Sequence, residues 1–160
     1  MSVRVGVANI IVDDQEQAER FYTEVLGLVK HIDVPAGGAR WLTLVSPDVP
    51  RLPDGSPAVQ LLLEPAGFEH AKTYKRKLYE AGVPHTMFFV DDLAAEHARL
   101  SAAGVRFASA PADMGDGLAA VFDDQGGNLI MLFQAHGPRP AHEQGQEHGR
   151  AEGERHGDAD

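Results

Sequence analysis

The feature that most constrains this chain is an internal repeat. Residues 12–14 (VDD) return as residues 90–92 (VDD), 78 positions later. Each copy ends a β-like apolar run and precedes a helix-period pattern, which stops at Gly27 in the first copy and at Gly104 in the second. The Asp side chains suit helix N-caps, because a carboxylate accepts the free N–H groups of a first turn. The repeat predicts two similar folding units.

The order of predicted elements is the same in both halves. The helices are expected over about 15–26 and 93–103, and each is followed by three strand-like segments: 29–35, 40–46 and 58–64, then 105–108, 118–123 and 128–134. A third amphipathic helix, about 68–81, joins the halves, and its exposed face is expected to carry Lys72, Lys75, Arg76 and Lys77. The sequence therefore predicts an α+β fold of two tandem β-α-β-β-β modules, whose eight strands form an open, barrel-like cleft.

A change of composition marks the end of the folded part. Residues 136–160 contain no Val, Ile, Leu, Met, Phe, Tyr or Trp, so they cannot bury enough surface to offset their ordering entropy. We predict one domain over residues 1–135, with module one at about 3–66, the connecting helix at about 68–82 and module two at about 83–134. Residues 136–160 are predicted to be a disordered polar tail, and the spacing of its four histidines matches no standard chelating pattern.

Charge and composition exclude several classes of protein. The net charge is −10, which does not suit binding to nucleic acid or to an anionic membrane surface. No apolar run approaches the roughly 18 residues that span a bilayer, and the first residues lack an apolar export signal, so a cytoplasmic location is expected. The chain has no cysteine, which excludes disulfides, thiolate metal sites and cysteine nucleophiles.

Two motifs resemble those of a known family. Residues 12–28 (VDDQEQAERFYTEVLGL) are similar to the opening of the vicinal oxygen chelate superfamily, and residues 121–130 (VFDDQGGNLI) are similar to its closing hairpin. The resemblance covers about residues 3–134 and implies paired β-α-β-β-β modules, usually in a homodimer. Members include glyoxalase I, extradiol dioxygenases, fosfomycin-resistance enzymes and the metal-free bleomycin resistance proteins.

The resemblance also implies where a metal would be held. Metal-dependent members place one ligand on the first and last strand of each module, and these positions fall here on Val7, Gln60, His85 and Met131. Val7 has no donor and a thioether is a poor ligand for Ni, Zn, Fe or Mn. The remaining weak candidates are Gln60 and His85, with Glu64 on the same strand face as Gln60. No full metal site and no catalytic residue are assigned.

Strand alternation predicts which side chains line the cleft. The expected ligand-binding residues are Val7, Asn9, Trp41, Gln60, His85, Met87, Phe89 and Met131. This set is mostly apolar with a few polar groups, which is typical of a site for a small organic molecule.

Three functions remain open on these observations. The first is a binding protein of bleomycin-resistance type, with a non-canonical site that holds a small molecule without the usual full metal site. The second is a metal-dependent lyase, isomerase or dioxygenase of glyoxalase type that uses a divalent ion. The third is a dimeric interaction protein with an occluded cleft. The number of metal donors favours the first.

Overall fold

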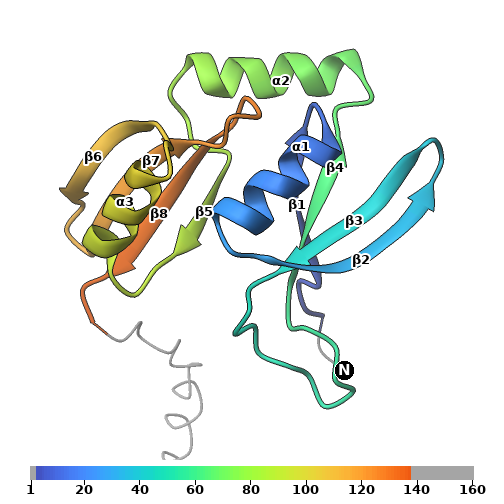
Figure 1. Ribbon diagram of the computed structural model, residues 1–160, viewed down its shortest axis with the longest axis horizontal. Helices are drawn as coiled ribbons and strands as arrows, with labels where there is room; N and C mark the ends of the chain where they lie inside the picture. Colours follow the sequence, from blue (N-terminus) through green and yellow to red (C-terminus); the bar gives the residue numbers. More distant parts are fainter. Residues whose placement is uncertain (1–2, 138–160) are drawn as a thin grey trace, which may run out of the picture.

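The computed structural model describes residues 3–137 as two modules joined by a helix (Figure 1). The predicted tail, 136–160, lies almost entirely outside the described residues. Module one contains β1 (Val7–Val12), α1 (Gln15–Arg20), the π-helical turn η1 (Phe21–Val25), β2 (Val29–Ala36), β3 (Ala39–Val45) and β4 (Gln60–Pro65). The helix α2 (Glu69–Glu80) follows. Module two contains β5 (Thr86–Phe89), α3 (Leu93–Ala102), β6 (Phe107–Asp113), β7 (Gly117–Asp123) and β8 (Leu129–Ala135).

The strands form two separate sheets of the same topology. The first, sheet one, has the order β1-β4-β3-β2, and the second, sheet two, has the order β5-β8-β7-β6. In each sheet the first strand pairs in parallel with the last, and the other pairs are antiparallel. Eight strands in two sheets that do not close into a barrel confirm the predicted α+β fold.

The repeated triplets cap the first helix of each module. The carboxylate of Asp14 accepts the backbone N–H of Gln17 at 2.9 Å, and that of Asp92 accepts the N–H of Ala95 at 2.9 Å. Gly27 and Gly104 follow these helices with φ of 82° and 84°, a region that favours glycine. The first helix differs from the prediction in its last turn, which widens to the π-helical η1.

One hydrophobic core joins the two modules. It includes Ile10 and Leu63 from sheet one, Phe21 from η1, and Phe122 and Ile130 from sheet two, and all of these side chains are buried. The rings of Phe21 and Phe122 lie 6.2 Å apart between centroids. Each sheet therefore has one face packed on the shared core and one face turned away from it, which we call its open face.

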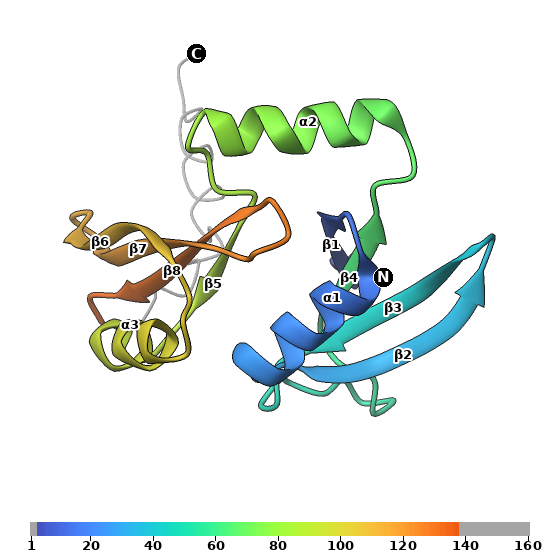
Figure 2. The same ribbon diagram turned by 45° about the horizontal axis from the view of Figure 1, so that its top comes forward.

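The connecting helix α2 lies across both modules, as the turned view shows (Figure 2). The expected exposed basic face of this helix is wrong at Lys75, whose side chain is only 6% exposed. Its ammonium contacts Asp13 of module one at 2.5 Å and donates to the Gly126 carbonyl of module two at 2.7 Å. The lysine is buried because it bridges two loops that are far apart in the sequence.

The β6 strand extends further than the sequence pattern predicted. It runs through Pro111, which the sequence suggested to be the start of a turn. A proline can occupy this position because β6 is the outer strand of sheet two, where an N–H is not needed for pairing. No helix within the described residues is both long and apolar enough to cross a membrane.

Candidate functional site: the two open sheet faces

The open face of sheet one collects the candidate residues of module one. Parallel pairing places Val7 beside Gln60 and Asn9 beside Leu62, while their strand neighbours Ile10 and Leu63 point into the core. Because side chains alternate along a strand, Val7, Asn9 and Gln60 share the face that is turned away from the core. The structure therefore brings these predicted residues together.

Polar side chains on this face are tied to one another. Asn9 donates a hydrogen bond from Nδ2 to Oε2 of Glu64, and both side chains are exposed. The hydroxyl of Thr43, which is fully buried, donates to Oε1 of Gln60 at 2.8 Å. Gln60 thus uses its amide oxygen within the sheet, in agreement with a structural role for that oxygen.

Trp41 lies on the same open face, because it alternates with Leu42, which points into the core. The antiparallel register pairs Thr43, two positions after Trp41, with Leu62 of β4. At this point the Nε2 of Gln15 donates to the carbonyls of Arg40 and Leu63, each at 2.8 Å, and so spans the two strands. The indole of Trp41 is 41% exposed, which leaves an aromatic surface free to contact a ligand.

An ion-pair network holds the strand that carries Trp41. Arg40 bonds Asp33 of β2 and Glu19 of α1, both at 2.6 Å, and Lys30 bonds Glu19 at 2.9 Å. Hydrogen bonding from Arg40, with a further bond from Lys30, lowers the pKa of Asp33 from 3.8 to about 2 despite some desolvation. Hydrogen bonding from Lys30 is the main cause that lowers the pKa of Glu19, and Arg40 adds to it. The charged forms are therefore favoured in the fold.

This network predicts a loss of stability in acid. A carboxyl group whose pKa is lowered by folding stabilises the fold above its ordinary pKa, and this contribution is lost as the pH falls through the folded pKa. For Asp33 the window runs from pH 3.8 down to about 2. We expect Arg40→Gln to flatten the fall of the melting temperature across this window, measured by circular dichroism.

The control for this prediction is Arg20→Gln. Arg20 forms an exposed pair with Glu16 at 2.9 Å on the same helix, and such surface pairs contribute little. An unchanged acid profile in Arg40→Gln, or the same flattening in Arg20→Gln, would contradict the role of the network.

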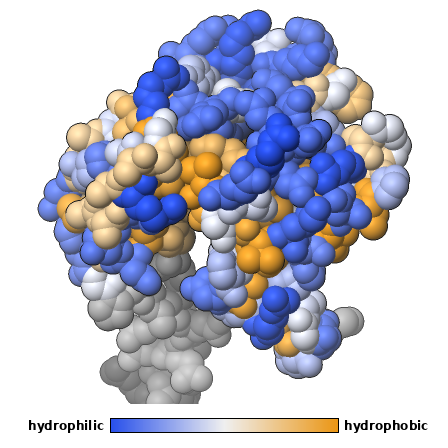
Figure 3. All heavy atoms as spheres, viewed as in Figure 1, coloured by the Kyte–Doolittle hydropathy of each residue, from blue (hydrophilic) through white to orange (hydrophobic). Residues whose placement is uncertain are grey.

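The open face of sheet two collects the candidate residues of module two. Met87 on β5 lies beside Met131 on β8, and the rings of Phe89 and Phe133 meet edge to face at 6.0 Å between centroids. Met87 is 42% exposed and Phe89 is 53% exposed, which is unusual for large apolar side chains. Figure 3 shows apolar residues, in orange, that reach the surface on both modules.

His85 begins this face at the end that lies near α2. Its ring meets that of Tyr74 edge to face at 6.4 Å, and its Nδ1 is buried without a hydrogen-bond partner in the described part of the chain. His85 is thus held between a helix and the sheet. No described contact brings it to Gln60, the other weak metal candidate.

The four inferred metal positions do not fit a divalent ion. Val7 and Gln60 lie on sheet one, whereas His85 and Met131 lie on sheet two. The strand pairs and hydrogen bonds described above connect residues of the same sheet, and none of them brings the first two positions to the last two. Among residues 3–137, no group of three or more His, Cys, Asp or Glu side chains could hold a metal ion. Glu64 bonds an amide, Asn9, instead of joining such a group.

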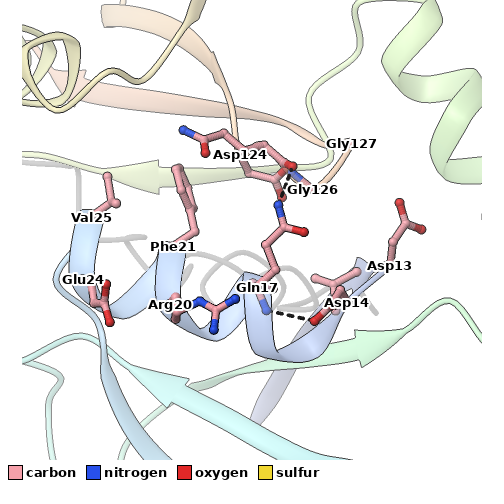
Figure 4. Close-up of a pocket in the computed structure, with 13 residues that line it drawn as sticks. Asp13, Asp14, Gln17, Arg20, Phe21, Glu24, Val25, Asp124, Gly126 and Gly127 are labelled. Carbon is pink, nitrogen blue, oxygen red and sulfur yellow. Dashed lines mark hydrogen bonds between the residues drawn. The ribbon is translucent and has the colours of Figure 1, made fainter.

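A hollow lies where the modules meet, and sequence reasoning missed it. A pocket of about 410 Å³ opens between α1 and the loop from β7 to β8, and its lining includes Gln17, Phe21 and Asp124. Figure 4 shows the side chain of Gln17 pointing from α1 toward that loop, where its amide approaches the Gln125 carbonyl at 3.4 Å. The sequence marked this loop only as a turn, because its partners lie more than 100 residues away.

Comparisons with known proteins agree with this architecture. Residues 4–132 match the model of the Glyoxalase/Bleomycin resistance protein/Dioxygenase superfamily. The chain is 47% identical over 132 residues to the uncharacterized protein YurT of Bacillus subtilis (strain 168), covering 82% of this chain and 99% of that protein.

Two solved structures are also similar. The structure of UcmS2 has a TM-score of 0.71 at 30% identity and covers 84% of this chain and 100% of its own. TnmS3, described as an antibiotic binding protein from Streptomyces sp. CB03234, has a TM-score of 0.65 at 27% identity, with coverage of 84% and 97%.

Proposed function

Because the chain belongs to the glyoxalase/bleomycin resistance protein/dioxygenase superfamily, we propose that it binds a small organic molecule on its open sheet faces without the full metal site of the family's enzymes. The observation that carries this proposal is the character of those faces. Trp41, Met87 and Phe89 are each more than two-fifths exposed, beside a few polar side chains that can orient a ligand. The likeness to TnmS3, an antibiotic binding protein, supports the same class of function.

We also propose that the protein acts as a homodimer in which a second copy helps to cover the open faces. Within the described residues, β1 and β5 each pair on one side only. The opposite edges, β2 and β6, carry Pro35 and Pro111, which discourage further pairing, whereas β1 and β5 contain no proline. Exposed apolar faces beside unprotected edges are suited to association. The site would act in the cytoplasm, with no nucleic acid or membrane as partner.

The test of binding uses the full chain and a neutral aromatic probe, 1-naphthalenemethanol. Trp41 is the sole tryptophan, so its single indole N–H resonance reports directly on the open face of sheet one. We expect a saturable shift of this resonance. Light scattering should give twice the chain mass of 17.2 kDa.

A matched pair of variants tests whether the open faces are responsible. Met87→Glu puts a charge on the open face of sheet two and should weaken the association of two copies. Val83→Glu changes an equally exposed apolar residue outside the strands and should have little effect. Equal effects of the two variants, or no shift of the Trp41 resonance, would count against the proposal. Stoichiometric metal in the untagged protein that is lost in His85→Ala would instead support a metal-dependent lyase, isomerase or dioxygenase.

A further inference from the structure

We propose that Gln15 is a positioning residue of the ligand site, whose side-chain amide holds the outer part of the β2–β3 hairpin and thereby fixes Trp41 on the open face of sheet one. We call this outer part, residues 34–41 with the turn at Gly37 and Gly38, the flap. This inference rests on the proposed function, because it concerns how the ligand site on that face is kept in its binding conformation.

Within the described residues, strand pairing attaches the flap to sheet one only at its base. The register between β3 and β4 ends at Thr43 and Leu62. The register between β2 and β3 continues through Val34 and Trp41 to the turn at the tip. Figures 1 and 2 both show this hairpin extending past β4. The backbone of the flap therefore pairs with itself and needs another contact to stay in line with the sheet.

The side-chain amide of Gln15 supplies that contact next to the base of the flap. Its Nε2 donates to the carbonyls of Arg40 in the flap and Leu63 in β4, each at 2.8 Å. Its Oε1 accepts the backbone N–H of Arg40 at 3.1 Å. A primary amide has two N–H donors and an acceptor oxygen, the same kinds of group that a neighbouring strand presents. One side chain thus joins the two strands where their own pairing has ended.

The helix α1 holds the flap at a second point. Gln15 and Glu19 are four positions apart, so they lie on one face of α1. Gln15 bonds the backbone of Arg40, and the carboxylate of Glu19 bonds its guanidinium at 2.6 Å. The side chains of Arg40 and Trp41 point to opposite sides of β3, because they are neighbours on a strand. Contacts that fix Arg40 from the helix side therefore fix the indole on the open face.

A flap that is already in place strengthens binding, because the ligand does not have to order it. The side chains of Trp41 and Val34 lie opposite each other across the flap and are 41% and 48% exposed, so they form its apolar surface. When only a fraction of the molecules has a site formed, the apparent affinity falls by that fraction. Gln15 is thus expected to act on affinity through the flap, from the face of the sheet opposite the ligand.

The test uses the ¹⁵N-labelled full chain, the neutral probe 1-naphthalenemethanol and the variant Gln15→Ala. Relaxation dispersion of the flap amides and of the Trp41 indole N–H measures motion between microseconds and milliseconds. We expect this motion to increase in Gln15→Ala, and the dissociation constant of the probe to rise about five- to tenfold. Saturating probe should suppress the motion again, since a ligand that prefers the held flap must also stabilise it.

The matched control is Gln17→Ala, a change of the same residue type on the same helix. The amide of Gln17 approaches the Gln125 carbonyl at 3.4 Å, in module two, and not the flap. This variant should leave the flap motion unchanged and the probe affinity within about twofold. Glu19→Gln keeps the size of the side chain and removes its ion pair with Arg40, so it should also increase the flap motion. It provides a second test if circular dichroism shows that Gln15→Ala does not fold.

The outcomes separate this inference from the proposed function. A mobile flap in Gln15→Ala with a probe affinity within about twofold of the unaltered chain overturns the inference, because the flap would then add nothing to the site. A flap that stays rigid, or equal effects of Gln15→Ala and Gln17→Ala, overturns it as well. Failure of the probe to shift the Trp41 resonance of the unaltered chain counts against the proposed function itself, and the inference falls with it.

Discussion

Asp124→Ala is expected to lower the free energy of unfolding by about 3–5 kcal/mol, among the largest effects of a single substitution in this chain. Asp124 is 3% exposed, and its Oδ1 accepts the backbone N–H groups of Gly126 and Asn128, both at 2.8 Å. Its Oδ2 accepts the Tyr22 hydroxyl and the Asn128 amide, also at 2.8 Å. Alanine would leave these donors buried without an acceptor.

The measurement is chemical denaturation of the full chain, followed by circular dichroism. Asp48→Ala removes an exposed carboxylate and should change stability by less than about 0.5 kcal/mol. Tyr22→Phe removes one of the four donors and should cost about 1–2 kcal/mol, between the other two variants. If Asp124→Ala proved no more harmful than Asp48→Ala, the carboxylate would not be the link between the modules.

The same contact has a consequence at alkaline pH. Burial raises the pKa of Tyr22 well above its ordinary value of 10, and the charge of Asp124 and the hydrogen bond to it raise it further. Because folding raises the pKa of Tyr22, its hydroxyl contributes fully to the free energy of unfolding below pH 10. This contribution is lost as the pH rises through the pKa of the folded state. This agrees with a neutral hydroxyl that donates to an ionised carboxylate across the module boundary.

Phe122→Ala is expected to cost about 3–5 kcal/mol and to destabilise both modules together. The Phe122 ring is fully buried, and its centroid lies 6.2 Å from that of Phe21 in module one and 6.0 Å from that of Phe107 in module two. Truncation would leave a cavity between the sheets, which close-packed neighbours fill only in part.

Two probes of unfolding test whether the modules respond together. Trp41 fluorescence reports on module one, and circular dichroism reports on both modules. Their transitions should coincide and shift together in Phe122→Ala, whereas Phe68→Ala, at a side chain that is 79% exposed, should have little effect. A Trp41 transition that stays at its original midpoint in Phe122→Ala would mean that module one is stable by itself.

Much of the fold could be predicted because its signals are local. The capping residues Asp14 and Asp92 lie three positions before the N–H groups that they accept, so they are visible in any short window of sequence. Alternation along a strand also assigned Val7 and Met87 to open faces, since neighbouring side chains point to opposite sides. What the open faces bind remains a proposal.

The links between the modules could not be predicted in this way. Tyr22 and Asp124 are 102 residues apart, and Lys75 is 51 residues from Gly126. The sequence pattern placed Lys75 on an exposed helix face, because periodicity within a helix contains no information about a loop from another element. The position of Asp124 predicted only a turn, since its partners come from another module.

The sequence by itself determined the two modules, their helices and the faces of their strands, because these depend on contacts within a few residues. The tertiary structure decided that both sheets share one core, and that Lys75 and Asp124 are buried at their junction. These features depend on which distant surfaces meet. That choice is made by packing the whole chain at once, so no local pattern specifies it.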